Sequence, residues 1–321
     1  MADHTSSAAD PNPPDATEAD HDRRGAYEGR HRAPQGPEHL SVWTTAQQTG
    51  PVQRRGRYVP GSVKHPARML PAIAAHAIHA YTQPGDLVLD PMCGIGTTLV
   101  EAIHAGRDAL GVEYEPRWSN IADANITHAH TQGATGRASV IRGDATRLNS
   151  LLPAALTGQV TLVVTSPPYG PTVHGLVRPG EHGVTKFDNF YNDGTDRGNL
   201  AYRDLTGLTD GFEQILTGCA TLLRPGGTVV VTARPWRKNG QLVDLPSAVI
   251  AAGLRAGLLP TERCVALLAA LRDGHLVARP SFFQLQAVRK ARTSGTPLHL
   301  ITHEDVLIFR QPAQPPHATS A

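Results

Sequence analysis

Short aliphatic runs alternate with amphipathic stretches through the middle of the chain. Apolar positions recur at helical spacing in three of the stretches between the runs, which are residues 97–106, 206–227 and 244–258, the last with Asp244 as its expected cap. This alternation predicts a doubly wound α/β domain whose mostly parallel sheet is covered on both faces. The expected strands are residues 86–90, 109–115, 138–145, 160–166, 228–233, 262–271 and 303–311.

The two ends of the chain lack this pattern. Residues 1–40 and 312–321 contain few aliphatic side chains and many prolines and polar residues. Such segments bury too little apolar surface to offset their ordering entropy, so we predict two disordered tails around a single domain of residues 41–311. Within the domain, residues 171–204 are long, polar and dotted with aromatic side chains, and we expect them to form a mobile loop over the substrate.

Composition narrows the class of protein only a little. The 321 residues carry a net charge of +2, which argues against a strongly basic nucleic-acid coat but allows a local basic face. Cys93, Cys219 and Cys264 are far apart in sequence and show no disulfide or zinc-site spacing, and the sixteen histidines form no convincing metal cluster. With no apparent signal peptide or membrane span, we expect a cytoplasmic protein with no bound metal.

Chemically informative residues follow the expected strands. Gly94 and Gly96 come directly after the first strand and allow a tight turn at the start of a helix, where a ligand can approach the backbone. Glu113, with Glu115 as the reserve, ends the second strand, where a carboxylate can accept both hydroxyl protons of a ribose. Asp144 follows the third strand and could accept from an adenine amino group, cap the next helix, or do both.

Two motifs in this context resemble a known family. "DPMCGIGTT" (90–98) and "TSPPY" (165–169) look like the motifs of the S-adenosylmethionine-dependent DNA aminomethyltransferases, which modify cytosine N4 or adenine N6. "VKHPARMLPAI" (63–73) and "HEDVLIF" (303–309) are similar to the segments that flank them in that family. The resemblance implies a seven-stranded, Rossmann-like methyltransferase sheet with its last strand antiparallel. It also implies S-adenosyl-L-methionine as cofactor, bound by His65, Pro66, Asp90, Pro91, Gly94, Gly96, Thr97, Thr98, Glu113 and Asp144.

The second motif suits methyl transfer to an exocyclic amine. The lone pair of such a nitrogen is delocalised into the ring, and hydrogen-bond acceptors aimed at its protons make it a better nucleophile. The Ser166 hydroxyl and the Pro167 carbonyl can be these acceptors, and Pro167 and Pro168 hold the backbone rigid. Tyr169 offers a ring on which an extruded base can stack. The four residues 166–169 are therefore the expected catalytic set.

The identity of the substrate stays open at this level. In the family, serine at the first position of the tetrad usually accompanies cytosine N4, so Ser166 favours that target in DNA. Adenine N6 in DNA, guanosine N2 in tRNA or rRNA, and a binding protein without turnover are the alternatives. Cytosine C5 methylation is disfavoured because it needs a Pro-Cys dipeptide, which is absent, and "GDLVLDPMCGIG" lacks the fingerprint of nicotinamide enzymes.

Several basic segments could contact nucleic-acid phosphates. Residues 41–85 contain no Asp or Glu, and "WRKNG" (236–240) and "VRKARTSG" (288–295) are expected to be basic loops. No separate target-recognition domain is visible, so the target sequence is short or a separate specificity or restriction partner supplies its recognition. The basic side chains expected to contact phosphates within residues 41–85 are Arg54, Arg55, Arg57, Lys64 and Arg68.

Overall fold

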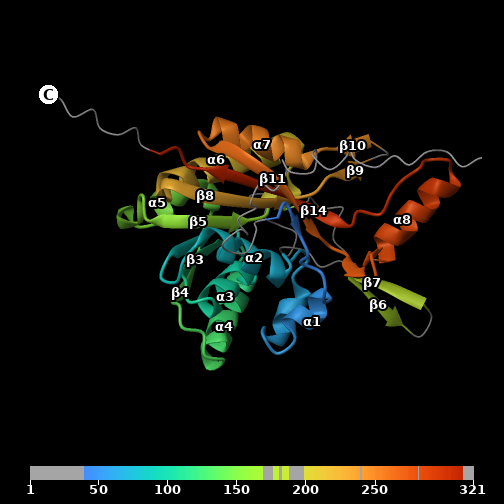
Figure 1. The fold of residues 1–321 in the computed structure, drawn as a ribbon, viewed down its shortest axis with the longest axis horizontal. Helices are drawn as coiled ribbons and strands as arrows, with labels where there is room; N and C mark the ends of the chain where they lie inside the picture. Colours follow the sequence, from blue (N-terminus) through green and yellow to red (C-terminus); the bar gives the residue numbers. More distant parts are fainter. Residues whose placement is uncertain are drawn as a thin grey trace, which may run out of the picture. The chain divides into compact units, whose positions relative to one another are not determined.

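The structure is a computed structural model that describes residues 40–168, 176–180, 183–187, 199–238, 241–280 and 282–313. These residues form an α/β sandwich around one eight-stranded sheet (Figure 1). In spatial order the strands are β1 (Val42–Trp43), β11 (Leu259–Leu267), β14 (His303–Arg310), β8 (Leu223–Ala233), β5 (Val160–Thr165), β2 (Leu87–Asp90), β3 (Asp108–Glu113) and β4 (Ala138–Arg142).

The predicted class of fold is confirmed. Strands β4, β3, β2, β5 and β8 pair in parallel, and β14 pairs antiparallel with both β8 and β11. All seven expected strands are present. The sheet has one strand more than predicted, because the two residues of β1 pair in parallel with β11 at the edge.

Helices cover both faces of the sheet. On one face lie α2 (Pro71–Tyr81), α3 (Thr97–His104) and α4 (Pro116–Thr131), and on the other lie α5 (Leu148–Leu151), α6 (Leu205–Leu222) and α7 (Leu245–Arg255) (Figure 1). Each face has its own apolar core, one built around Phe212 and Phe309 and the other around Ile73 and Leu99. Strands buried on both faces appear in the sequence as unbroken aliphatic runs, which is why their positions could be predicted.

The remaining elements lie outside these layers. The short β9–β10 hairpin follows the carboxyl end of β8, and Figure 1 shows it together with helix α8. A second short hairpin, β12–β13, follows the carboxyl end of β11 and precedes α8. Their bounds, and those of the other short elements, are α1 (Gly50–Arg54), β6 (Leu176–Gly180), β7 (Gly183–Phe187), β9 (Trp236–Lys238), β10 (Gln241–Val243), β12 (Ala270–Arg272), β13 (His275–Val277), α8 (Phe282–Thr293) and the 3-10 helices Pro60–Lys64, Ala145–Arg147, Ala154–Leu156 and Leu200–Tyr202.

Three local predictions were wrong. The helix expected over 206–227 ends at Leu222, and its last residues belong to β8, where Gly226 has a φ of 73° and its amide donates to the Gln311 carbonyl. "WRKNG" begins with strand β9, and "VRKARTSG" is largely the second half of α8, because neighbouring chain supplies partners that the local sequence does not reveal. Most of the predicted mobile loop, residues 171–175, 181–182 and 188–198, lies outside the described residues.

Candidate functional site

The glycine-rich turn after β2 has the geometry that its glycines permit. Gly94 and Gly96 have φ values of 55° and 78°, in the left-handed region that favours glycine, and Gly96 is the N-cap of α3. A Cβ atom on Gly94 would lie 3.0 Å from Nε2 of His65, and one on Gly96 would lie 3.2 Å from Cβ of Ala122. Both positions therefore exclude larger side chains for conformational and steric reasons.

The Asp90 side chain stabilises this turn through two hydrogen bonds. Its Oδ2 accepts a hydrogen bond from the Thr98 hydroxyl (2.7 Å) and its Oδ1 accepts one from the Met92 amide (3.1 Å). Burial raises the pKa of the Asp90 carboxyl to about 6, against the opposing effect of these two donors. The carboxylate therefore joins the end of β2 to the first turn of α3.

Glu113 joins the end of β3 to the same turn. Its Oε2 accepts from the Gly94 amide (2.8 Å), and its Oε1 accepts from the Glu115 amide (2.8 Å). Burial raises the pKa of Glu113 to about 7, although both amides oppose the shift. Each carboxylate oxygen keeps a further lone pair, so the group can still accept from two ligand hydroxyls. The reserve candidate, Glu115, accepts instead from Nδ2 of Asn199 (2.8 Å).

Asp144 is placed as a helix cap. Its Oδ1 accepts from the amide (3.0 Å) and the hydroxyl (2.8 Å) of Thr146, at the start of a short 3-10 helix. Asp144 therefore caps the helix, as one of the two predicted roles requires. Its side chain is exposed at the wall of the cavity described below, and its contact with a ligand stays a prediction.

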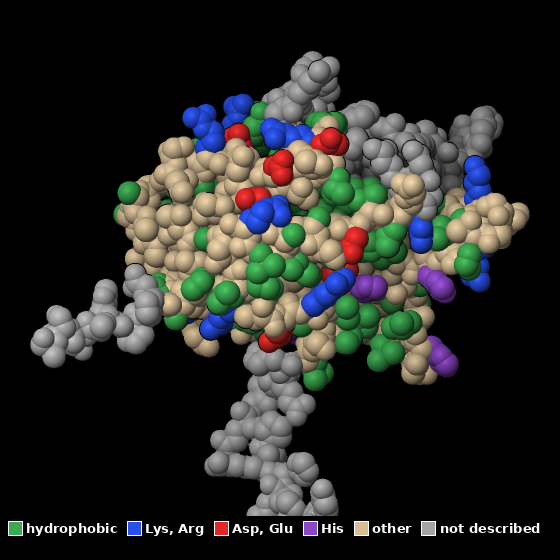
Figure 2. Space-filling model, turned by 90° about the horizontal axis from the view of Figure 1, so that it is seen from above, with side chains coloured by type: hydrophobic (Ala, Val, Ile, Leu, Met, Phe, Trp, Pro, Cys, Tyr) green, Lys and Arg blue, Asp and Glu red, His purple; other side chains and the backbone are tan. Residues whose placement is uncertain are grey.

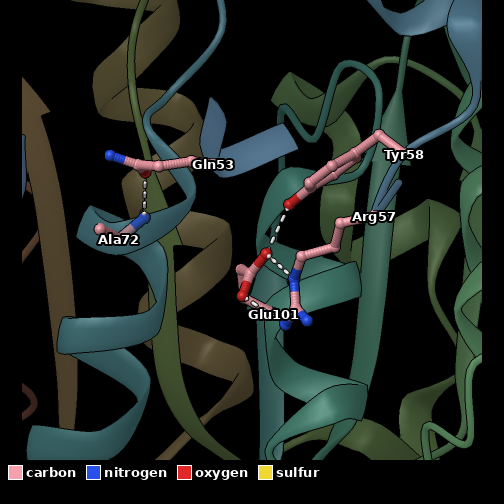
Figure 3. A network of polar contacts seen from close by, with 5 residues as sticks. All are labelled: Gln53, Arg57, Tyr58, Ala72 and Glu101. Atoms are coloured by element: carbon pink, nitrogen blue, oxygen red, sulfur yellow. Dashed lines mark hydrogen bonds and ion pairs between the residues drawn. The ribbon is translucent and has the colours of Figure 1, made fainter. Parts of the chain in front are cut away.

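A strap formed by residues 50–70 closes another side of the site. Figure 3 shows two of its anchors: the Gln53 Oε1 accepts from the Ala72 amide (3.0 Å), and Glu101 binds both Arg57 and Tyr58. The Arg57 guanidinium donates to the two oxygens of Glu101 at 2.8 and 2.7 Å, and the Tyr58 hydroxyl donates to Oε1 at 2.7 Å.

Asn125 on α4 ties the strap to the glycine-rich turn. Its Oδ1 accepts from the Val59 amide (2.8 Å), and its Nδ2 donates to the Ser62 hydroxyl (2.9 Å) and to the Ile95 carbonyl (2.8 Å). These contacts bring buried His65 against Gly94, where the imidazole also makes an edge contact with the ring of Trp118 at a centroid distance of 4.7 Å.

The strap corrects the prediction of a basic face in this segment. Arg57 is committed to Glu101, Arg68 donates to the Ser62 carbonyl (2.8 Å), and Arg54 donates to the Met69 carbonyl. Burial lowers the pKa of Arg68 to about 10. Only Arg55 and Lys64 of the five expected basic side chains are exposed, because the other three hold the strap in place.

One cavity of about 1200 Å³ unites nearly all the predicted site residues. Ser166, Pro167 and Pro168 line it where β5 ends, together with residues from the strap and from the ends of β2 and β3. Gly96 is not among the residues that line the cavity and serves the turn, and Tyr169 lies outside the described residues. The predicted cofactor residues that line the cavity are His65, Pro66, Asp90, Pro91, Gly94, Thr97, Thr98, Glu113 and Asp144.

The opposite wall was not predicted from sequence. It is formed by Arg234 and Trp236 after β8, by Arg279, and by the α8 residues Gln284 and Val288. The signal that could have found it is the scarcity of acidic residues in 234–243 and 274–303, since both stretches contain Lys or Arg and no Asp or Glu.

The cavity fits an adenosyl cofactor beside a base. A glycine in its wall at position 94, a carboxylate at the end of β3 and a volume well above that of one small ligand are the features such a pair needs. Cys93 is buried beneath the turn, and burial raises its thiol pKa, which leaves it without the character of a nucleophile. Within the described residues no group of His, Cys, Asp or Glu is arranged to bind a metal, and no helix is long and apolar enough to cross a membrane.

Comparison with known proteins supports the family resemblance inferred from the sequence. Residues 6–124, which include "DPMCGIGTT" but not "TSPPY", match the family model of N6/N4 methylases, described as DNA methylase, and this match confirms the predicted resemblance to that family. That family implies S-adenosyl-L-methionine as the cofactor. The matched segment begins within the predicted N-terminal tail, and the predicted domain boundaries stay predictions.

Curated relatives resemble only part of the chain. A tRNA (guanine(10)-N2)-dimethyltransferase of Methanocaldococcus jannaschii is 33% identical over 107 residues, which are 33% of this chain and 30% of that protein. The type II methyltransferase M.BglI of Bacillus subtilis is 35% identical over 72 residues, which are 22% of this chain and 21% of that protein. The matches thus span less than a third of either relative.

A solved structure gives a broader but weaker likeness. The crystal structure of TrmN from Thermus thermophilus has a TM-score of 0.47 and 17% identity, over 81% of this chain and 53% of that one.

Proposed function

We propose that this chain, which matches the N6/N4 DNA methylase family over residues 6–124, transfers a methyl group from S-adenosylmethionine to an exocyclic amine of a DNA base. Cytosine N4 is the favoured target because the residue before the two prolines is Ser166, and adenine N6 is the alternative. The observation that carries the proposal is that Ser166, Pro167 and Glu113 line one cavity.

The residues at the end of β5 have the chemistry that an exocyclic amine requires. Bound S-adenosylmethionine supplies an electrophilic methyl group. The Ser166 hydroxyl and the Pro167 carbonyl accept the two amine protons, and these hydrogen bonds strengthen as the nitrogen becomes tetrahedral. As the bond from nitrogen to the methyl carbon forms, the bond from that carbon to the cofactor's sulfur breaks and S-adenosylhomocysteine is left. The nitrogen then loses one of its protons to solvent, so no side chain with a shifted pKa is needed for the step.

Buried groups around the site fix the relative position of donor and amine. Asp90 and Glu113 hold the glycine-rich turn, and Pro167 is itself buried, so the reacting groups meet on rigid backbone. Holding two reactants in line within a site shielded from water supplies much of the acceleration in such reactions. Tyr169 is the proposed stacking platform for the extruded base.

A product analysis tests the proposal directly. The purified protein is incubated with tritiated S-adenosylmethionine and either genomic DNA or bulk tRNA, and the nucleosides are then separated and identified by mass spectrometry. We expect label in N4-methyldeoxycytidine. Label in N6-methyldeoxyadenosine would move the target to adenine, and absence of label from DNA would contradict the proposal.

Methylation of guanosine N2 in tRNA is the second candidate. It is favoured by the similarity of 107 residues to a tRNA (guanine(10)-N2)-dimethyltransferase. The tRNA arm of the same experiment separates the two candidates. If the only labelled product is N2-methylguanosine from tRNA, the substrate is tRNA and the proposal of a DNA substrate is wrong. Ser166→Ala is compared with the wild type in both arms, because label transferred by this chain should form about a hundredfold more slowly in that variant.

A further inference from the structure

Helix α8 (Phe282–Thr293) has one face toward the cavity and one face toward solvent. Gln284, Val288 and Ala291 recur at helical spacing and are half-buried, and the first two line the cavity wall. On the opposite side Gln286, Arg289, Lys290 and Thr293 are all exposed, at the spacing that aligns side chains along one face of a helix. The helix therefore presents a polar, basic row away from the protein.

The surroundings of this row are basic as well. Residues 274–303 contain Arg279, Arg289, Lys290 and Arg292 and no Asp or Glu, whereas the whole chain has a net charge of only +2. Residues 234–243, which include the β9–β10 hairpin, add three more basic residues and no acid. In Figure 2, Lys, Arg and His side chains are visible at the end of the molecule where Figure 1 places α8. A polyanion is the partner that this charge distribution fits.

The shape of the helix selects among polyanions. Figure 1 shows α8 standing apart from the helices that cover the sheet. Its 12 residues span about 18 Å, and an α-helix of this kind fits the major groove of B-form DNA. The deep, narrow major groove of A-form RNA excludes such a helix. Gln and Arg side chains are also the common partners of adenine and guanine edges in the major groove.

We propose that α8 lies in the major groove of duplex DNA and presents Gln286, Arg289 and Lys290 to it. The inference rests on the proposed function, because it supplies the duplex from which the target base is taken. The inner face of α8 lines the same cavity as Ser166, so the proposed DNA contact belongs to an element of the site itself. The basic residues of the adjacent segments then contact phosphates on either side of the groove.

The test compares two double variants of equal charge. Arg289→Gln with Lys290→Gln alters the outer face of α8. Arg224→Gln with Arg255→Gln is the matched control, because these arginines lie at the start of β8 and the end of α7, away from the carboxyl ends of the parallel strands that carry the site. Binding of a labelled mixed-sequence DNA duplex of about 30 base pairs is measured from about 50 to 200 mM salt, with bulk tRNA as a parallel probe.

We expect the α8 variant to lose about two units from the slope of log affinity against log salt, because each cation held against the duplex displaces condensed counter-ions and contributes roughly 0.9 to the slope. The control should keep the wild-type slope, and both variants should keep their melting temperature and their affinity for S-adenosylmethionine. In addition, Gln286→Ala should relax the preference for one base around the methylated site by roughly tenfold to a hundredfold, measured by mapping methylated positions in genomic DNA.

Two results would overturn the inference. One is an α8 variant that binds duplex DNA with the wild-type slope, and the other is a loss of affinity confined to tRNA. If the wild-type protein methylates DNA in either case, the proposed function stands while the assignment of α8 is wrong. Conversely, an α8-dependent salt slope in a protein that methylates no DNA supports the assignment of α8 and contradicts the proposed function.

Discussion

At the scale of single residues, the protonation of Glu113 governs the end of β3. Burial raises the pKa of its carboxyl from 4.5 to about 7, so the group is partly protonated at neutral pH. The unfolded chain ionises first as the pH rises, and the free energy of unfolding therefore falls between these two values. Only the ionised carboxylate accepts from two ribose hydroxyls, which couples cofactor binding to the same titration.

We predict that affinity for S-adenosylmethionine rises by about tenfold between pH 6 and pH 8, since the ionised fraction of Glu113 changes by about that factor around a pKa near 7. Calorimetric titrations at several pH values measure this change. Glu113→Gln has no titrating group at this position and should bind weakly with a flat profile across the same range. An equally steep profile in Glu113→Gln would assign the titration to another group.

Ser166 tests the chemistry without disturbing the core. The side chain is only half-buried, so Ser166→Ala should keep the melting temperature and the cofactor affinity of the wild type. Removing one preorganised acceptor should slow methyl transfer by roughly a hundredfold, or about 3 kcal/mol in the activation free energy. Single-turnover methylation of DNA measures the rate, and a wild-type rate would exclude Ser166 from the mechanism.

At the scale of elements, the strap depends on Glu101. This carboxylate is buried on α3 and is the shared partner of Arg57 and Tyr58, so Glu101→Gln leaves a half-buried cation without its counter-ion. We predict a loss of about 3 kcal/mol in the free energy of unfolding, measured by denaturant titration. The strap includes His65, so cofactor affinity should fall as well.

An exposed pair of the same kind is the control for this prediction. Glu213 and Arg255 join α6 to α7 at 2.6 Å, with half of the arginine side chain exposed to solvent. Exposed ion pairs contribute little, so Glu213→Gln should change the free energy of unfolding by less than about 1 kcal/mol. If Glu101→Gln and Glu213→Gln lowered the free energy of unfolding equally, the buried ion pair of the strap would contribute no more stability than an exposed one.

Some elements of this protein could be predicted from the sequence and others could not, and the extent of their burial and their length explain which. The seven strands of the covered sheet and the turn at Gly94 carry their signal locally, as aliphatic runs and glycines. Strand β1 has only two residues, and β9 and β10 have three each, which is too few to show alternation. The polar outer face of α8 resembles a loop in the sequence. The inward roles of Arg57 and Arg68 depend on tertiary contacts, as the 44-residue separation of Arg57 from Glu101 illustrates.

At the scale of the whole molecule, stability should be concentrated in the centre of the sheet. Strands β8 and β14 are buried by helices on both faces, whereas the β9–β10 and β12–β13 hairpins have only two short strands each. We predict that amides in the centres of β8 and β14 exchange with solvent only through global unfolding, and that hairpin amides exchange orders of magnitude faster. Hydrogen exchange followed by mass spectrometry, beside a denaturant titration, measures both, and fast exchange in β14 would contradict this picture.

The central place of β14 bears on how the chain is made. A ribosome delivers β8 and β11 first, and β14, which separates them in the finished sheet, follows about forty residues after the end of β11 has been joined. During that interval β8 keeps an unpaired apolar edge, the kind of surface to which chaperones bind and on which nascent chains aggregate. A chain that ends before His303 therefore leaves this edge of β8 unpaired, even though it already contains every glycine and proline of the two motifs.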